Sequence, residues 1–342
     1  TEIYTLSLHD ALPIFFISLV SAPQVKEVGK LISTRLGRPL EPFDIWYNGF
    51  RVDKDGISEA ELDKILNKKY PDRMAFEKDL PNILKKLGFE KEKAHSIASL
   101  IQVDPSRGAG HAWGAEMHSD KSRLRTRIGK NGMDYKGYNI AIHEFGHNVE
   151  QTITLQDMDF YSLHGVPNTA FTEAMAFIFQ KRDRELLGIS NGANNMHLMA
   201  LDNFWSCYEI MGVSLVDMSV WKWLYANPNC TASQLNEAVN KIAVEVWNKY
   251  YADVFGIKNQ TILAIYSHMI DNPLYLSAYP IGHLIDFQIE QYIEGKNLAK
   301  EISRMLVQGR VIPQVWMMGA VGNKISTQPI LDATTDALKH IQ

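Results

Sequence analysis

The spacing of apolar residues predicts a chain built mainly from helices. Apolar positions recur at intervals of three and four residues over most of the sequence, which is the period of a helix with one face in a core. Ser58 with Glu61 forms a capping pair that opens a helix, which we expect to run to about residue 68. Two further helices are expected, near 75–87 and 91–101.

A second capping pair, Thr231 with Gln234, opens a long amphipathic helix that we expect to end at Gly256. A different period appears only in 123–128, where apolar or small residues alternate with three arginines. This alternation predicts a strand at the edge of a sheet, because charges on an edge strand discourage pairing with other chains. The expected fold class is therefore mainly α, with a small β-sheet edge.

The amino-acid composition argues against several kinds of binding partner and site. The chain has 342 residues, of which 46% are hydrophobic and 22% charged, so it has ample material for a core. Its 39 acidic and 35 basic side chains leave no basic excess, so nucleic acid is not an expected partner. The longest apolar run, 11–20, is about half of the roughly 20 residues that a membrane span needs. Cys207 and Cys230 are too few for a disulfide scaffold or a four-thiolate zinc site.

Candidate chemistry lies in the segment His143-Glu144-Phe145-Gly146-His147. Residues four apart share one face of a helix, so His143 and His147 can direct their imidazoles at one metal ion. Glu144 lies beside them and is placed to take a proton from a water activated by that ion. A helix whose two histidines are ordinary core or surface groups gives the same pattern, so a third ligand is needed to decide.

Glu173 supplies a candidate third ligand. It follows His147 within 170–179, a segment that is apolar on nearly all sides, so its carboxylate should be buried. A buried carboxylate costs several kcal/mol unless a cation lies beside it. A zinc ion bound by His143, His147 and Glu173 would be that cation, with a fourth position open; the alternative partners are Arg123 and Arg125. A third histidine ligand of the metzincin kind is excluded, because the required positions hold Glu150 and Ile153.

These motifs resemble the thimet oligopeptidase and oligoendopeptidase F family of zinc peptidases. The family has HEFGH on one helix, a Glu about 25 residues later in a Phe-x-Glu context, and a tyrosine-rich segment near the C-terminus. The counterparts here are 143–147, 171–173 and 275–283, and the resemblance spans roughly residues 100–342. The Pro-Ser-Gln that usually follows the third ligand is replaced by Met175-Ala-Phe177.

The resemblance implies a mostly helical fold with a deep channel for short or unstructured peptides. It also implies that the strand at 123–128 pairs with the substrate backbone, and that Tyr275 and Tyr279 donate hydrogen bonds to the developing oxyanion. His283 stands one step from where the family has a third tyrosine, and it would serve as a further donor. The spacing of Tyr275, Tyr279 and His283 also fits an aromatic stripe on a core helix, so both interpretations stay open.

The predicted function is zinc-dependent hydrolysis of peptide bonds in short or unstructured peptides, with one Zn²⁺ per chain. Two alternatives are a metallocarboxypeptidase on a similar frame and a non-catalytic helical binding protein that keeps a fossil metal site. We expect residues 1–20 to be a foreign leader, because 6–14 resembles a translated sequencing adapter. The catalytic region is then expected over 21–342, with the metal site in 100–190 and a helical part over 191–342. The sequence does not decide compartment or oligomeric state.

Overall fold

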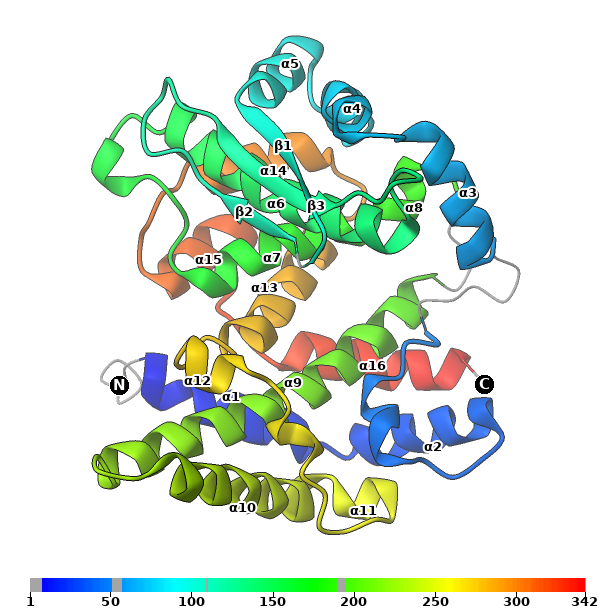
Figure 1. The fold of residues 1–342 in the computed structure, drawn as a ribbon, viewed down its shortest axis with the longest axis vertical. Coiled ribbons are helices and arrows are strands. Elements are labelled where there is room, and N and C mark those ends of the chain that lie inside the picture. Colours follow the sequence, from blue (N-terminus) through cyan, green and yellow to red (C-terminus); the bar gives the residue numbers. More distant parts are fainter. Residues whose placement is uncertain (1–7, 51–56, 109, 190–194, 342) are drawn as a thin grey trace. The chain divides into compact units, whose positions relative to one another are not determined.

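The computed structural model describes residues 8–50, 57–108, 110–189 and 195–341, which form two compact units (Figure 1). Unit 1 comprises Thr1–Asp53, Ala193–Leu284 and Ser326–Gln342, and unit 2 comprises Lys54–Gly192 and Ile285–Ile325. The fold is mainly α with one small sheet, as the sequence predicts. Among the described helices, none is long and apolar enough to cross a membrane.

Unit 1 is organised around the long helix α9 (Asn195–Ala226), against which α1, α2, α10 and α16 pack. Large side chains of α9, among them Trp205 and Tyr208, are fully buried, because neighbouring helices cover several of its faces. The other elements of unit 1 are α1 (Leu8–Val20), α2 (Gln24–Leu36), η2 (Pro42–Trp46), α10 (Ala232–Tyr250), α11 (Ala252–Phe255), η4 (Ile262–Ala264), α12 (His268–Asp271) and α16 (Gln328–His340). Helix α13 (Ala278–Ile293) contributes residues to both units.

The helix expected between Thr231 and Gly256 begins as predicted but is interrupted. Thr231 forms its capping box with Gln234, and Gly256 ends the segment in the left-handed conformation, with φ of 70°. However, α10 stops at Tyr250 and a separate short helix, α11, follows. Tyr251 at the break is fully buried, and its hydroxyl donates to the carbonyl of Tyr208. That contact is with a residue distant in the sequence, so the local pattern does not reveal the break.

Unit 2 places a three-stranded sheet against helix α6 (Figure 1). The capping box of Ser58 opens α3 as predicted, and the helices expected near 75–87 and 91–101 are α4 and α5. The elements of unit 2 are α3 (Glu59–Lys69), α4 (Arg73–Lys86), α5 (Lys91–Ser99), β1 (Ile101–Ser106), β2 (His111–Trp113), β3 (Ser122–Arg127), α6 (Tyr135–Asp157), η3 (Tyr161–Leu163), α7 (Thr169–Gln180), α8 (Asp183–Leu186), α14 (Leu298–Leu306) and α15 (Pro313–Val321).

The predicted edge strand is in fact the central strand of this sheet. The strand order is β1-β3-β2, with β3 parallel to β1 and antiparallel to β2. The alternation itself is confirmed, since Leu124 and Thr126 are buried. A central position is tolerated because neighbouring strands supply partners for the charges: Arg123 pairs with Asp104 on β1, and the Arg125 guanidinium lies over the Trp113 ring on β2. The short strand β2 is an edge of the sheet instead.

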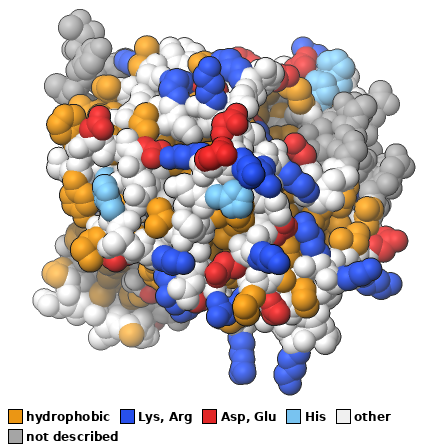
Figure 2. All heavy atoms as spheres, turned by 90° about the horizontal axis from the view of Figure 1, so that it is seen from above, with side chains coloured by type: hydrophobic (Ala, Val, Ile, Leu, Met, Phe, Trp, Pro, Cys, Tyr) orange, Lys and Arg blue, Asp and Glu red, His pale blue; other side chains and the backbone are white. Residues whose placement is uncertain are grey.

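The described surface carries charges of both signs. Figure 2 shows basic and acidic side chains interspersed over one face of the protein, with no continuous basic patch on that face. This distribution agrees with the formal net charge of −4.

Unit 1 contains a buried carboxylate, Glu209 on α9, which is 9% exposed. The Tyr266 hydroxyl and the Trp46 indole both donate to its Oε1. Burial raises the pKa of Glu209 to about 7, although these two hydrogen bonds act in the opposite direction. The folded-state pKa of Glu209 lies above the ordinary value. The stability that the protonated Glu209 contributes is therefore present at low pH and is lost as the pH rises through about 7.

Replacing Glu209 by Gln should flatten the pH dependence of stability. A tenfold change in proton affinity corresponds to about 1.4 kcal/mol, so ionising Glu209 in the folded protein costs about 3 kcal/mol. Glu209→Gln should therefore gain roughly 2–3 kcal/mol relative to wild type between pH 5 and pH 8, measured as the free energy of urea unfolding. Glu237→Gln, at an exposed position on α10, is the control. Parallel pH curves for wild type and Glu209→Gln would contradict the prediction.

Candidate metal centre

Helix α6 carries the histidine motif, and its start is fixed by local contacts. The Asp134 side chain caps the helix by accepting from the Gly137 amide at 2.7 Å. The Thr126 hydroxyl donates to the Gly137 carbonyl at 2.7 Å, which ties β3 to the first turn of α6. Beyond this turn the helix is buried on most sides, because the sheet packs on it and so does α7. The motif therefore lies in the interior of unit 2.

Helices α6 and α7 approach each other closely at Gly146. A Cβ atom added to Gly146 would lie 2.8 Å from the Cα of Ala176 and 3.0 Å from the carbonyl oxygen of Met175. Both atoms belong to the α7 backbone, so only glycine allows this separation of the helices. Glu173 lies less than one turn before Ala176, and its carboxylate is thereby brought to the two histidines.

His143, His147 and Glu173 form a compact cluster. The Nε2 atoms of His143 and His147 lie 3.5 and 3.9 Å from Glu173 Oε2, and the candidate ligand atoms all lie within 4.8 Å of one another. In a tetrahedral zinc site with bonds of about 2.0–2.2 Å, neighbouring ligand atoms are about 3.3–3.6 Å apart. The 3.5 Å separation lies in this range and the 3.9 Å separation is slightly longer, so two imidazoles and one carboxylate are grouped as a candidate site for a metal ion such as zinc.

The surroundings shift the pKa values of the two histidines in opposite directions. Burial lowers the pKa of His147 to about 4, so its imidazole is neutral, which is the form that binds a metal. Burial also disfavours protonation of His143, but the Glu173 carboxylate beside it more than offsets this and raises the pKa of His143. Glu173 thus attracts a positive charge at this position, as a proton or as a metal ion.

Glu144 is buried beside the cluster without belonging to it. It follows His143 directly, is 8% exposed, and does not belong to the three-residue cluster. Burial raises the pKa of Glu144 to about 7, which is the range in which a carboxylate exchanges protons efficiently at neutral pH. A Cβ atom at Gly110, just before β2, would lie 3.0 Å from Glu144 Oε1, so the backbone leading into the edge strand passes close to this carboxylate.

Both histidines of the cluster are hydrogen-bonded through Nδ1 to residues of α7. His143 Nδ1 lies 3.0 Å from Gln180 Oε1, and His147 Nδ1 lies 3.0 Å from Thr172 Oγ1. The sequence interpretation missed both partners. Thr172 precedes Glu173 directly, and a polar residue at that place in an apolar helix was the available signal.

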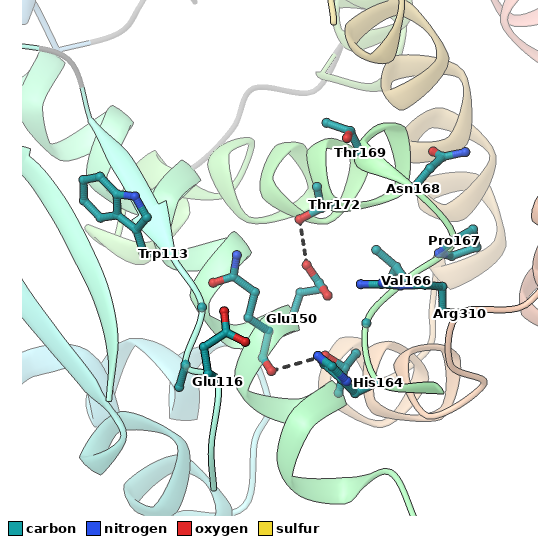
Figure 3. A pocket seen from close by; sticks show the side chains of 15 residues that line it. Trp113, Glu116, Glu150, His164, Val166, Pro167, Asn168, Thr169, Thr172 and Arg310 are labelled. Carbon is teal, nitrogen blue, oxygen red and sulfur yellow. Dashed lines mark hydrogen bonds between the residues drawn. The ribbon is translucent and has the colours of Figure 1, made fainter. Parts of the chain in front are cut away.

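A cavity of about 540 Å³ lies next to the metal cluster in unit 2 (Figure 3). Glu150, one turn beyond His147, lies in its wall and accepts a hydrogen bond from Thr172 at 2.6 Å, and Arg310 reaches toward it from the other side. Burial raises the pKa of Glu150 to about 7, and the hydrogen bond and the Arg310 charge moderate this effect. His164 also lines this cavity.

The remaining predicted site residues, Tyr275, Tyr279 and His283, belong to unit 1. The rings of Tyr275 and Tyr279 are 5.4 Å apart and contact edge to face. Tyr275 precedes α13, so the expectation that all three lie on one helix is wrong for this residue. All three are partly exposed rather than fully buried, and their approach to the metal cluster stays a prediction.

The two arginines that the sequence offered as alternative partners of Glu173 are engaged elsewhere. Arg123 pairs with Asp104, and the Arg125 guanidinium lies over the Trp113 ring.

Known proteins resemble this chain in fold. No protein-family model and no curated protein sequence matches it. A structure described as an oligoendopeptidase F from Bacillus anthracis str. Ames superposes with a TM-score of 0.62 at 11% identity, covering 99% of this chain and 57% of that one. Metallocarboxypeptidase 1 of Trypanosoma cruzi gives 0.57 at 13% identity, covering 98% and 67%, and PZ peptidase A gives 0.57 at 11%, covering 90% and 60%. The chain therefore has the fold of these peptidases and spans little more than half the length of the first.

Replacing Gly146 by Ala should weaken metal binding. The added methyl group would collide with the α7 backbone at Ala176 and Met175, so α7 must move and carry Glu173 away from the histidines. We expect the dissociation constant for zinc, measured by competition with a chromophoric chelator, to rise by about 10-fold or more. Gly188→Ala is a matched control, since a Cβ there meets no atom within 4 Å, although its φ of 81° makes that change mildly strained. Equal zinc affinity in wild type and Gly146→Ala would contradict the steric account.

Proposed function

We propose that this chain is the catalytic part of a zinc metallopeptidase that hydrolyses bonds in short or unstructured peptides. The observation that carries the proposal is the cluster of His143, His147 and Glu173, with the buried carboxylate of Glu144 beside it. Similarity of fold to oligoendopeptidase and metallocarboxypeptidase structures supports the same class of reaction. A non-catalytic protein with a fossil metal site would not need a buried base next to the metal.

In the proposed mechanism, His143, His147 and Glu173 hold the zinc ion. The ion supplies Lewis acidity toward the attacking water and the scissile carbonyl. Glu144 takes a proton from that water and passes it to the leaving amine, a role that its raised pKa suits. Tyr275, Tyr279 and His283 are proposed as hydrogen-bond donors to the oxyanion.

The edge strand β2 is the proposed docking site for the substrate backbone. The resemblance assigned this role to 123–128, but that segment is β3, which has a partner strand on both sides. Among the described residues, strand β2 pairs with β3 alone, so its other edge is the proposed place for an extended peptide. Gly110, which precedes β2, approaches Glu144, so a peptide added along this edge would run past the base.

A metallocarboxypeptidase is the second candidate, and Arg310 is the observation that favours it. A carboxypeptidase requires a cation for the terminal carboxylate of its substrate, and the Arg310 guanidinium lines the cavity beside the metal cluster. Products from one peptide with a free C-terminus and from its amidated counterpart separate the two activities. Internal cleavage of both peptides supports the endopeptidase, and removal of single residues from the free peptide alone supports the carboxypeptidase.

Replacing Glu144 by Gln should abolish most hydrolysis and leave the zinc content unchanged. The amide cannot accept the water proton, and general-base catalysis is typically worth about 10²–10⁴-fold in rate. Glu144 is not a ligand, so about one zinc per chain should remain by elemental analysis. Glu185→Gln, an exposed change on α8, is the control and should keep wild-type turnover. A Glu144→Gln protein that still turns over substrate normally would refute the assignment of the base.

Tyr279→Phe and His283→Ala should each lower kcat by about 10²-fold, with little change in KM or zinc content. We expect kcat to fall while KM stays nearly constant, because the lost hydrogen bond forms mainly in the transition state. Steady-state kinetics and elemental analysis on both variants measure it. A variant that keeps normal kcat but melts at a lower temperature would show that the residue is a packing residue of unit 1.

A further inference from the structure

Each of the two ligand histidines is the inner end of a hydrogen-bonded chain that leads to a carboxylate. For His147 the chain runs from Nδ1 to Thr172 Oγ1 at 3.0 Å and from the Thr172 hydroxyl to Glu150 Oε2 at 2.6 Å. For His143 it runs from Nδ1 to Gln180 at 3.0 Å, then to Asn139 at 2.7 Å and to Asp183 at 2.7 Å.

The direction of every hydrogen bond in the His143 chain follows from its outer end. An ionised carboxylate only accepts, so the Asn139 amide nitrogen donates to Asp183 Oδ2. Asn139 Oδ1 then accepts from Gln180 Nε2, which leaves Gln180 Oε1 to accept from His143 Nδ1. Tyr135 also donates to Asp183 Oδ2, at 2.8 Å. His143 is therefore protonated on Nδ1, with the Nε2 lone pair directed at the cluster.

The His147 chain is shorter, and the directions of its hydrogen bonds follow from the same argument. The Thr172 hydroxyl has one proton, which it donates to Glu150, so its oxygen accepts from His147 Nδ1. His147 Nε2 then carries the unprotonated lone pair, and this atom lies 3.9 Å from Glu173 Oε2. The carboxylate at the outer end is 3% exposed, and no cation lies within 4.0 Å of it among the described residues. Its hydrogen bond to Thr172 is therefore a main contact of this buried group.

We infer that Thr172 with Glu150, and Gln180 with Asn139 and Asp183, are positioning residues that fix the tautomer and the ring orientation of the two zinc-binding histidines. The inference rests on the metal site of the proposed function and adds the residues that prepare its ligands. A carboxylate-terminated chain also draws the Nδ1 proton outward, which makes Nε2 a stronger donor to the metal. Removing such a contact typically costs about 10–100-fold in metal affinity.

The two chains differ in their surroundings. Asp183 receives hydrogen bonds from Asn139 and Tyr135 on α6 and from the Arg184 amide, so its end of the chain is held by several donors. Glu150 lies in the wall of the cavity next to Thr172, as Figure 3 shows. The His147 chain therefore depends on a single hydroxyl, and Thr172 is the position where one substitution tests the inference most sharply.

The experiment compares the zinc dissociation constants of five variants with that of wild type by chelator competition. Thr172→Val removes the hydroxyl at nearly constant volume and should raise the constant about 10–100-fold. Thr172→Ser keeps the hydroxyl and should stay within about threefold of wild type, and Glu150→Gln, which keeps a neutral acceptor, should fall between the two. Gln180→Leu should weaken binding through the other chain. Thr169→Val is the matched control, because Thr169 opens the same helix and hydrogen-bonds neither histidine within the described residues.

Metal affinity is measured on each protein after its fold has been checked by circular dichroism and thermal unfolding. Wild-type zinc affinity in folded Thr172→Val would overturn the inference, as would an equal loss in Thr169→Val, since that would indicate a general weakening of α7. The absorption spectrum of the cobalt-substituted proteins gives a second readout, which should change in Thr172→Val and be restored in Thr172→Ser. A wild-type chain that binds no zinc would refute the proposed metal site itself, a different result from equal affinities across the series.

Discussion

The close approach of α6 and α7 at Gly146 is the constraint on which the site depends. Glu173 and the two histidines come from different helices, and their side chains are short compared with the usual separation of about 8–10 Å between packed helix axes. The absence of a side chain at Gly146 lets the α7 backbone come within contact distance, which places a carboxylate 4% exposed against two imidazoles. A negative charge in that position is costly alone and favourable beside a cation. The close packing of α6 on α7 therefore buries the Glu173 carboxylate, and this buried charge in turn favours a cation beside the two histidines.

Local spacing explains why the centre of the site could be predicted from the sequence. His143, Glu144 and His147 lie within two turns of one helix, so their relative directions follow from helical geometry alone. Glu173 could be added because a lone carboxylate in an apolar helix needs a partner. The mainly helical class and the capping boxes at Ser58 and Thr231 were predictable for the same reason, since each depends on residues close together in the sequence.

Features that depend on distant residues could not be predicted in this way. The alternation at β3 reveals which residues are buried but not how many strands flank it, so the central position was missed. Thr172 and Gln180 hydrogen-bond the histidines only because of how α6 and α7 cross. Likewise, Tyr275 lies before α13 rather than on it, after Leu274, which has a left-handed φ of 60° that no apolar pattern signals.

The discontinuous make-up of the two units has a consequence for the order of events during synthesis on the ribosome. Residues 54–192 form one continuous stretch that contains the whole sheet together with α6 and α7, so the three metal ligands emerge in a single segment. In unit 1, α9 packs against α1 from the first stretch and α16 from the last. The nascent chain therefore exposes part of the apolar surface of α9 for more than a hundred residues of elongation, from 226 to 328. Such surface is what chaperones bind, so unit 1 should need them during synthesis.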